Sequence, residues 1–197
     1  MTSGEAITRT YPFYNVDDII LGSINMVDDE YWDGATVFDW WRRQSRERSV
    51  TYIQNEIVKI NRNPPVDLIH SVRLASGEVI GCGQVVNASG PRAAKTAAMA
   101  GIDIPVEPRK RFPWIFLAAK PLDKELPLTI DPSGVHVREI GGGTYQCGGH
   151  SDFDPAVDFD DFEMDFTSWE NHVWPIIANR IPQFDAVKVT HEWAGHY

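Results

Sequence analysis

Cysteine is scarce in this chain of 197 residues, which contains only Cys82 and Cys147. A disulfide framework needs more cysteines, and a closed structural zinc site needs four cysteine or histidine ligands. We therefore interpret both residues as reduced, buried thiols.

Long apolar runs are also missing. The longest, residues 112–119, contains Pro113 and is far shorter than the roughly 20 residues of a membrane-spanning helix. The first residues lack the apolar core of a secretory signal and the Arg-rich face of an organelle presequence. We expect a soluble intracellular protein with no transmembrane segment, in the cytoplasm, or in the mitochondrial matrix if the source is eukaryotic.

Basic residues are outnumbered by acidic ones, 18 to 28, which gives a formal charge of −10 and a pI near 5.0. This charge repels phosphate backbones, so we expect no nucleic-acid partner and no anionic-membrane partner. Hydrophobic residues make up 43% and charged residues 23%, as in ordinary globular domains. The length suits one domain, or one and a half.

Known nucleotide and nucleophile motifs are absent from the chain. The Gly81-Cys82-Gly83 run has Val86 where a dinucleotide fingerprint needs its third glycine. No G-x-x-x-x-G-K loop and no G-x-S-x-G elbow occur. The residues alone therefore indicate no self-contained catalytic constellation.

Metal-binding patterns fail on spacing. His191 and His196 are five apart, which on a helix separates them by roughly 140° instead of placing them on one face. Asp152, Asp154 and Glu163 match three positions of a calcium loop, but residues 156 and 157 are Ala and Val, where a ligand and a glycine are needed. We predict no metal site and interpret residues 152–163 as a solvated acidic loop.

Periodicity predicts a mixture of helices and strands. Asp33 is a candidate N-cap for a helix over residues 35–48, whose arginine-rich end we interpret as solvated. Gly77 is the expected turn residue of a hairpin. The other predicted helices are residues 92–101 and 166–180. The predicted strands are residues 50–54, 56–61, 71–74, 79–87, 106–119, 134–138, 144–149 and 187–193.

Several short blocks of the chain resemble, in order and spacing, the middle of flavoproteins of the D-amino-acid-oxidase and sarcosine-oxidase (DAO) superfamily. The resemblance is greatest to its branch of FAD-dependent oxidoreductase domain-containing proteins. The blocks are Tyr31-Trp32-Asp33-Gly34, Asn55-Glu56-Ile57-Val58, Val85-Val86-Asn87-Ala88-Ser89-Gly90-Pro91, Pro105-Val106-Glu107-Pro108-Arg109-Lys110-Arg111, Cys147-Gly148-Gly149, Val173-Trp174-Pro175 and Trp193-Ala194-Gly195. Together they extend over nearly the whole chain.

The resemblance implies an α+β fold, a mixed α/β middle portion of a two-domain flavoprotein. Residues 1–104 would form part of the FAD-binding domain, residues 105–186 an antiparallel substrate-domain sheet with helices, and residues 187–197 the start of a return to the FAD domain. The superfamily's Gly-rich loop and the segment beyond the W-A-G block are not in this chain. We therefore expect an internal fragment, whose partners include those missing N- and C-terminal segments.

FAD is the cofactor that the resemblance implies. Val58 is expected to contact its adenine end through the backbone, and the Asn87-Ala88-Ser89-Gly90 turn to pack beside its nucleotide portion. Small residues and extended backbone permit contact with a flat ligand. Trp193 and Gly195 of the W-A-G block are expected to be cofactor-binding as well. The alternative interpretation of residues 87–90 is an ordinary strand-to-helix turn.

The resemblance also supplies candidate residues for a small-molecule substrate. His150 corresponds to a position where amine-oxidising relatives carry a histidine near the flavin, which gives it an expected catalytic role; the alternative is an exposed loop histidine. Arg109 and Arg111 alternate with Lys110 and so share a strand face, where they would bind an anionic substrate or lie on the surface. Tyr197 replaces an arginine that holds the substrate carboxylate in amino-acid-oxidising relatives, which argues against simple α-amino-acid oxidation.

We therefore expect a fragment of a FAD-dependent oxidoreductase that oxidises an amine or amino-acid-like substrate by hydride transfer to flavin. The isolated chain is expected to bind FAD weakly or not at all and to be inactive. Two alternatives stay open. One is a non-catalytic interaction module of the respiratory-complex assembly type, and the other is a non-functional truncated product.

Overall fold

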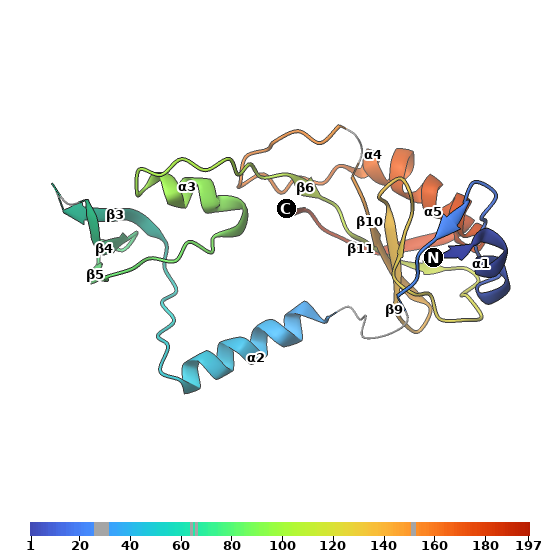
Figure 1. Ribbon diagram of the computed structural model, residues 1–197, viewed down its shortest axis with the longest axis horizontal. Helices are drawn as coiled ribbons and strands as arrows, with labels where there is room; N and C mark the ends of the chain where they lie inside the picture. The colour runs from blue at the N-terminus through green and yellow to red at the C-terminus, as the bar shows by residue number, and fades with distance from the viewer. Residues whose placement is uncertain (26–31, 64, 66, 151–152) are drawn as a thin grey trace. The chain divides into compact units, whose positions relative to one another are not determined.

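The computed structural model describes residues 1–25, 32–63, 65, 67–150 and 153–197. The chain folds into two compact units. The first unit combines Met1–Asp29 with Pro108–Tyr197, and the second is Glu30–Glu107 (Figure 1). Each unit is described by itself below.

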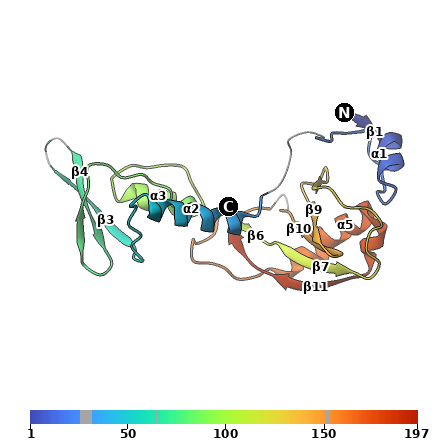
Figure 2. The same cartoon turned by 90° about the horizontal axis from the view of Figure 1, so that it is seen from below.

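The first unit is built on a five-stranded antiparallel sheet in the order β11-β7-β10-β9-β8. Figure 2 shows β7 and β11 side by side, with α5 next to the strands. The strands are β7 (Trp114–Ala118), β8 (Thr129–Ile130), β9 (His136–Gly141), β10 (Thr144–Gly148) and β11 (Val187–Glu192). The β9–β10 hairpin turns through Gly142 and Gly143, whose φ angles of 62° and 72° favour glycine.

One face of this sheet forms the main hydrophobic core. Trp114 and Phe116 of β7 and Tyr145 of β10 are almost fully buried against the C-terminal helical segment. That segment contains α4 (Phe166–Ser168), a π-helical turn η2 (Trp169–Val173), α5 (Trp174–Arg180) and a 3-10 turn η3 (Pro182–Asp185). The predicted helix 166–180 is therefore interrupted, because Pro175 has no N–H to donate into a regular helical ladder.

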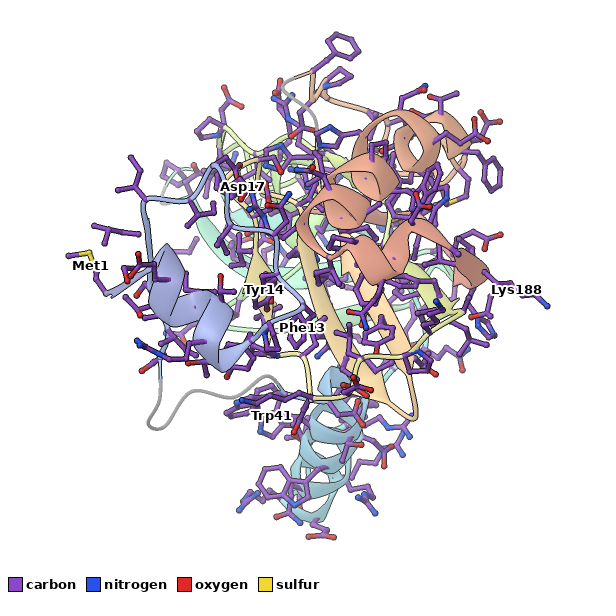
Figure 3. All side chains as sticks on the ribbon, turned by 90° about the vertical axis from the view of Figure 1, so that its right-hand side faces the viewer. Met1, Phe13, Tyr14, Asp17, Trp41 and Lys188 are labelled. Atoms are coloured by element: carbon purple, nitrogen blue, oxygen red, sulfur yellow. The ribbon has the colours of Figure 1, made fainter. Side chains whose placement is uncertain are left out.

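An N-terminal segment packs against the same core. It contains β1 (Thr2–Ser3), α1 (Gly4–Thr10) and β2 (Leu21–Gly22). Figure 3 shows Phe13 and Tyr14 lying between this segment and the sheet, and both rings pack on the core. The buried Arg180 of α5 fixes the segment, because its guanidinium binds the Asp18 carboxylate at 2.8 and 2.9 Å and the Asp131 carboxylate at 2.8 Å.

The strand predicted over residues 106–119 is divided in the structure. Only β6 (Lys110–Arg111) and β7 are strands, and Pro113 lies between them. The short β6 pairs with β12 (Gly195–His196) in a two-stranded antiparallel ribbon, with Gly195 opposite Arg111 and His196 opposite Lys110. Proline at residue 113 lacks the N–H that a continuous ladder would need.

The second unit contains a helix, a three-stranded meander and a short helical turn. Its elements are α2 (Gly34–Glu47), β3 (Ile57–Asn63), β4 (Leu68–Leu74), β5 (Val79–Gly81), a 3-10 turn η1 (Gly90–Arg92) and α3 (Ala93–Ala98). The predicted hairpin is confirmed, since β4 pairs with β5 and Gly77 turns with a φ of 90°. A small core forms around Ile60, Val72 and Ala100.

Helix α2 begins as predicted, because the Asp33 carboxylate accepts hydrogen bonds from the backbone N–H groups of Ala35 and Thr36. None of its residues is buried, and Phe38 and Trp41 are 64% and 56% exposed. Trp41 projects from the helix in Figure 3. Helical periodicity therefore located this element but not its packing partner.

Two strand predictions in the second unit are wrong. Residues 50–54 form no strand, and the strand expected over 79–87 ends at Gly81. Val50, Ile53 and Val86 are exposed, whereas Val85 packs against the small core of this unit without being in a strand. Tyr31, part of one family-like block, and Asp152 lie outside the described residues.

The expected mixed α/β fold with an antiparallel sheet is confirmed. The boundaries of the compact units differ from the expected divisions at residues 104 and 186. Residues 1–29 group with the second half of the chain, and β11 pairs with β7 within the main sheet. The assignment of these parts to cofactor binding and to substrate binding stays a prediction.

Candidate functional site

The basic strand β6 lies beside an acidic segment of the same unit. Arg111 donates from Nη1 and Nη2 to the two carboxylate oxygens of Asp154, each at 2.9 Å. The neighbouring Arg109 donates to the backbone oxygen of Asp154. Both arginines thus contact one residue, Asp154.

We name residues 153–163 the acidic strap, because further contacts fasten this segment to the β6–β12 ribbon. Lys110 binds the Asp161 carboxylate at 2.9 Å and the backbone oxygen of Glu163 at 3.2 Å. The His196 ring lies 2.8 Å from the backbone oxygen of Asp161 and stacks on Phe162 with a centroid distance of 4.4 Å. Both strands of the ribbon are therefore held by the strap.

The expectation of a solvated acidic loop is wrong for Asp154 and Asp161, which pair with Arg111 and Lys110. Hydrogen bonding to Arg111 holds the pKa of the Asp154 carboxyl below its usual range, with Coulombic contributions from Arg111, Arg109 and His150. Lys110 does the same for the pKa of Asp161. The partners lie more than 40 residues earlier in the chain, so the local acidic composition gave no sign of them.

Tyr197 and Arg109 are joined through their backbones. The Tyr197 N–H donates to the Arg109 oxygen at 2.9 Å, and the Arg109 N–H donates to the Tyr197 oxygen at 3.1 Å. The Arg111 guanidinium lies 5.4 Å from the centroid of the Tyr197 ring, which is a cation–π distance. The structure thus brings together all three predicted substrate residues, with Asp154 already paired to Arg111.

His150 follows the end of β10 and is exposed. Its backbone oxygen lies 3.0 Å from Nε2 of His172. The charge of His150 contributes to the lowered pKa of Asp154, so the residue lies near the strap. Its catalytic role stays a prediction.

The second face of the main sheet carries polar residues that the sequence reasoning missed. We name it the open face, and its central row runs across four strands through Arg138, Gln146, Ile115 and His191, which are successive cross-strand partners. Arg138 donates from Nε and Nη2 to Oε1 of Gln146 at 3.2 and 2.8 Å. Strand alternation could have found this row, because Val137 and Cys147, next to Arg138 and Gln146, are buried on the opposite face.

His136 lies two residues before Arg138 on the same strand face. Its partner across the ladder is Gly148, and a Cβ there would come within 3.1 Å of the His136 ring. The absence of a side chain at Gly148 thus leaves room for the imidazole. Partial desolvation, followed by the charge of Arg138, lowers the pKa of His136. The open face therefore presents a neutral imidazole beside a fixed guanidinium at neutral pH.

The predicted nucleotide-contacting residues all lie in the second unit. Val58 is 46% exposed on β3. The Asn87 side chain donates to the Ala93 oxygen at 2.9 Å, and the Ser89 hydroxyl lies 2.9 Å from that of Thr96. Gly90 has a φ of 54°, and open space surrounds the position of a Cβ there and at Gly195 of the first unit. Exposed backbone of this kind fits close contact with a flat ligand.

The W-A-G block joins β11 to β12 in the first unit. The Trp193 side chain is exposed, and the backbone N–H of Trp193 donates to the Pro113 oxygen at 3.4 Å. Ala88 lies in the turn before η1 and is exposed. Within the described residues no group of three His, Cys, Asp or Glu side chains is arranged to hold a metal ion, and no helix is long and apolar enough to span a membrane.

The family model named FAD dependent oxidoreductase (DAO) matches residues 1–197. This chain belongs to the DAO family of FAD-dependent oxidoreductases. FAD-dependent oxidoreductase domain-containing protein 1 of Bos taurus is 26% identical over the whole chain, which covers 46% of that protein. The chain thus spans about half the length of the curated relatives it matches.

Solved structures share the fold of the DAO chain. L-Proline dehydrogenase from P. horikoshii matches with a TM-score of 0.84 at 21% identity, over all of this chain and 51% of that one. L-α-Glycerophosphate oxidase from Mycoplasma pneumoniae, solved with FAD bound, matches with a TM-score of 0.72 at 17% identity, over 99% of this chain and 51% of that one. These structural similarities confirm the fold. Together with the family match, they confirm the expected protein class, the FAD-dependent oxidoreductases.

Proposed function

We propose that this chain contributes to a FAD-dependent oxidoreductase that oxidises an amine or amino-acid-like substrate. The observation that carries the proposal is the open face of the main sheet. It combines a fixed cation, a neutral imidazole and apolar positions in a chain of a FAD-dependent family. When bound, FAD supplies the two-electron acceptor for this chemistry.

The open face is a better substrate surface than the predicted Arg109 and Arg111 pair. Asp154 already occupies both guanidinium nitrogens of Arg111 that face it, so a substrate carboxylate would have to displace that carboxylate. On the open face, Arg138 donates to the neutral amide oxygen of Gln146. Arg109, Arg111 and Tyr197 then position the W-A-G block instead of touching the substrate.

His136 supplies the proton-handling group of this proposal. Amine oxidation needs the uncharged amine, so a nearby base must take a proton from the ammonium form. The lowered pKa of His136 keeps its ring neutral and able to accept that proton at neutral pH. His150 remains the catalytic histidine expected from the resemblance. Replacing His136 and His150 one at a time shows which of the two imidazoles amine oxidation requires.

For the cofactor, we propose that the Asn87-Ala88-Ser89-Gly90 turn and Val58 hold the nucleotide portion, and that Trp193 and Gly195 approach the flavin. The Asn87 and Ser89 side-chain hydrogen bonds fix the turn, and the open space at Gly90 and Gly195 admits a flat ligand. An ordinary strand-to-helix turn would make the same internal hydrogen bonds. Direct contact between residues 87–90 and bound FAD is therefore what distinguishes a cofactor-binding turn from an ordinary one.

The test uses the protein purified from its natural source. A tag is added to the gene at its natural locus, the protein is purified, and its flavin spectrum is recorded without oxygen before and after addition of sarcosine, proline or glycerol 3-phosphate. The proposal predicts co-purifying FAD that is bleached by an amine. Bleaching by glycerol 3-phosphate alone would contradict the amine substrate.

A second candidate function is a non-catalytic assembly module. Its support is helix α2, whose Phe38, Trp40 and Trp41 side chains are all at least half exposed within a helix without buried residues. The same purification distinguishes this candidate. A stoichiometric protein partner without any flavin would favour the assembly module and exclude the oxidoreductase.

A further inference from the structure

We propose that the acidic strap positions the W-A-G block for the flavin, with Asp154 and Asp161 as the positioning residues. This inference rests on the proposed function, in which Trp193 and Gly195 approach the flavin. The two carboxylates themselves touch no cofactor. They act through the basic strand β6, which lies between the strap and the W-A-G block.

The first argument is the strand pairing of the W-A-G block. Every second residue of the chain end directs its backbone groups toward residues 109–113, and these are Trp193, Gly195 and Tyr197. Backbone groups alternate in direction along an antiparallel pair, so those of Ala194 and His196 point away from residues 109–113. The W-A-G block is therefore an edge, whose position depends on the strand beside it.

The second argument is that the strap lines the opposite side of that strand. Arg109 and Ala156 form an antiparallel bridge, and the Val157 N–H donates to the Pro108 oxygen at 3.0 Å. Residues 108–111 thus lie between the strap and the chain end. A strand that is paired on both sides is held more firmly than a strand of an isolated two-stranded ribbon, which is only marginally stable in water.

The third argument is the pair of ionic contacts that fasten the strap. Asp154 accepts from Nη1 and Nη2 of Arg111, each at 2.9 Å, and Asp161 binds Lys110 at 2.9 Å. The four side chains are between 18% and 34% exposed, so water and salt screen these ion pairs less than fully exposed ones. Hydrogen bonds from the two cations lower the pKa of both carboxyls, which keeps them charged at neutral pH.

The fourth argument is that the contacts of the strap reach the chain end itself. Nε2 of His196 lies 2.8 Å from the backbone oxygen of Asp161, and the His196 ring stacks on Phe162. The guanidinium that Asp154 holds lies 5.4 Å from the centroid of the Tyr197 ring. Gly195 has no side chain, so its position is set by these neighbouring contacts and by its strand pairing.

The first part of the experiment measures backbone amide relaxation by NMR on the 197-residue chain. In the wild type, Ala194 and Gly195 should have order parameters of about 0.85, as in rigid backbone. Asp154→Asn should lower both values, because the neutral amide cannot form the charged pair with Arg111. Asp161→Asn should lower the order parameter of His196 as well, and the double variant should lower all three further than either single variant does.

Matched variants separate positioning from folding. Asp154→Glu keeps the carboxylate and should restore order to the W-A-G block. Glu163→Gln changes an exposed side chain of the same strap and should leave the block as it is in the wild type. The amide of Tyr145, whose side chain is fully buried, should stay rigid in every variant, which shows that the main sheet is intact.

The second part introduces Asp154→Asn at the natural locus and measures how fast the purified protein releases its flavin. A partly exposed ion pair contributes modestly, so we expect release to accelerate about fivefold at low ionic strength. Salt screens the ion pair in the wild type, so the difference between wild type and variant should shrink at high ionic strength. Asp154→Glu should release flavin at nearly the wild-type rate.

The inference is overturned if Asp154→Asn leaves the order parameters of Ala194 and Gly195 unchanged, or if Glu163→Gln lowers them equally. It is also overturned if Asp154→Asn releases flavin no faster than the wild type. Failure of the proposed function appears separately. A flavin-free natural protein whose chain end still loses order in Asp154→Asn would contradict the oxidoreductase and retain the positioning by the strap. A flavin that is bleached by an amine but released at the same rate in both proteins would retain the oxidoreductase and exclude the positioning.

Discussion

Arg111 and Asp154 form a bidentate ion pair, in which each carboxylate oxygen lies 2.9 Å from a different guanidinium nitrogen. The pair connects β6 to the acidic strap, 43 residues later in the chain. Because β6 pairs with β12, the same contact holds the last described strand in place. An acidic segment that composition marks as solvent-exposed thus has a structural role.

Asp154→Asn should loosen the strap. The neutral amide cannot form the charged pair, and both partners are about one quarter exposed, so we expect a loss of about 1 kcal/mol in unfolding free energy. Hydrogen exchange at the Arg109 and Tyr197 amides should accelerate. Glu163→Gln in the same strap, whose side chain is exposed, is the control, and unchanged exchange in Asp154→Asn would contradict the role of the pair.

The strap should also release in acid. The pKa values of Asp154 and Asp161 are lowered in the folded chain, so the unfolded chain binds protons more readily. Their stabilisation is present above the ordinary carboxyl pKa of about 3.9 and is lost as the pH falls through the lower folded-state values. Hydrogen exchange at the Arg109 and Tyr197 amides, compared between wild type and Asp154→Asn across this range after correction for intrinsic rates, checks the expectation. A constant difference down to the lowest pH would contradict it.

Arg180→Met should be strongly destabilising. Arg180 is 7% exposed, and its removal leaves the nearly buried carboxylate of Asp131 without its cation. We expect a loss of about 3 kcal/mol, measured by urea denaturation followed by tryptophan fluorescence. The exposed Arg73 of β4 is the control, and Arg73→Met should change stability little. Equal stability of the two variants would show that Arg180 does not fix the N-terminal segment.

Tyr14→Phe should remove the hydrogen bond to Thr129 and keep the packed ring. The expected cost is about 1 kcal/mol near neutral pH. Burial raises the pKa of Tyr14 to about 12, so its contribution should be present below pH of about 10 and lost between about 10 and about 12. Spectroscopic titration of the folded protein should lose one late-titrating phenol in the variant. Identical titration curves would contradict the burial of Tyr14.

Two adjacent residues of β7 test the two faces of the sheet. Phe116 is fully buried and Leu117 is 42% exposed on the open face. Phe116→Ala should cost about 3–5 kcal/mol and Leu117→Ala under about 1 kcal/mol in urea unfolding. A large loss for Leu117→Ala in the isolated chain would mean that the open face is covered.

Local features were predictable from the sequence. Asp33 lies next to the helix that it caps, and the Gly77 hairpin joins neighbouring strands, so short-range propensities decide both. Long-range contacts were not predictable. Arg180 and Asp18 are 162 residues apart, and nothing in their neighbourhoods indicates that they meet. The grouping of residues 1–29 with the second half of the chain depends on such contacts.

The candidate site was predictable only in part. The Arg109-Lys110-Arg111 run indicated that the two arginines act together, and both contact Asp154. Its occupation by Asp154 could not be foreseen from a segment that looked solvated. Arg138 and Gln146 were missed although each alternates with buried residues, because their pairing depends on the register of a hairpin.

The most direct measurement is a crystal structure of the naturally expressed, tagged protein with its flavin. The account predicts an isoalloxazine ring facing the open-face row of Arg138, Gln146 and Ile115, and a nucleotide portion beside the Asn87–Gly90 turn. A flavin placed away from this row, or an assembled protein without flavin, would contradict the account.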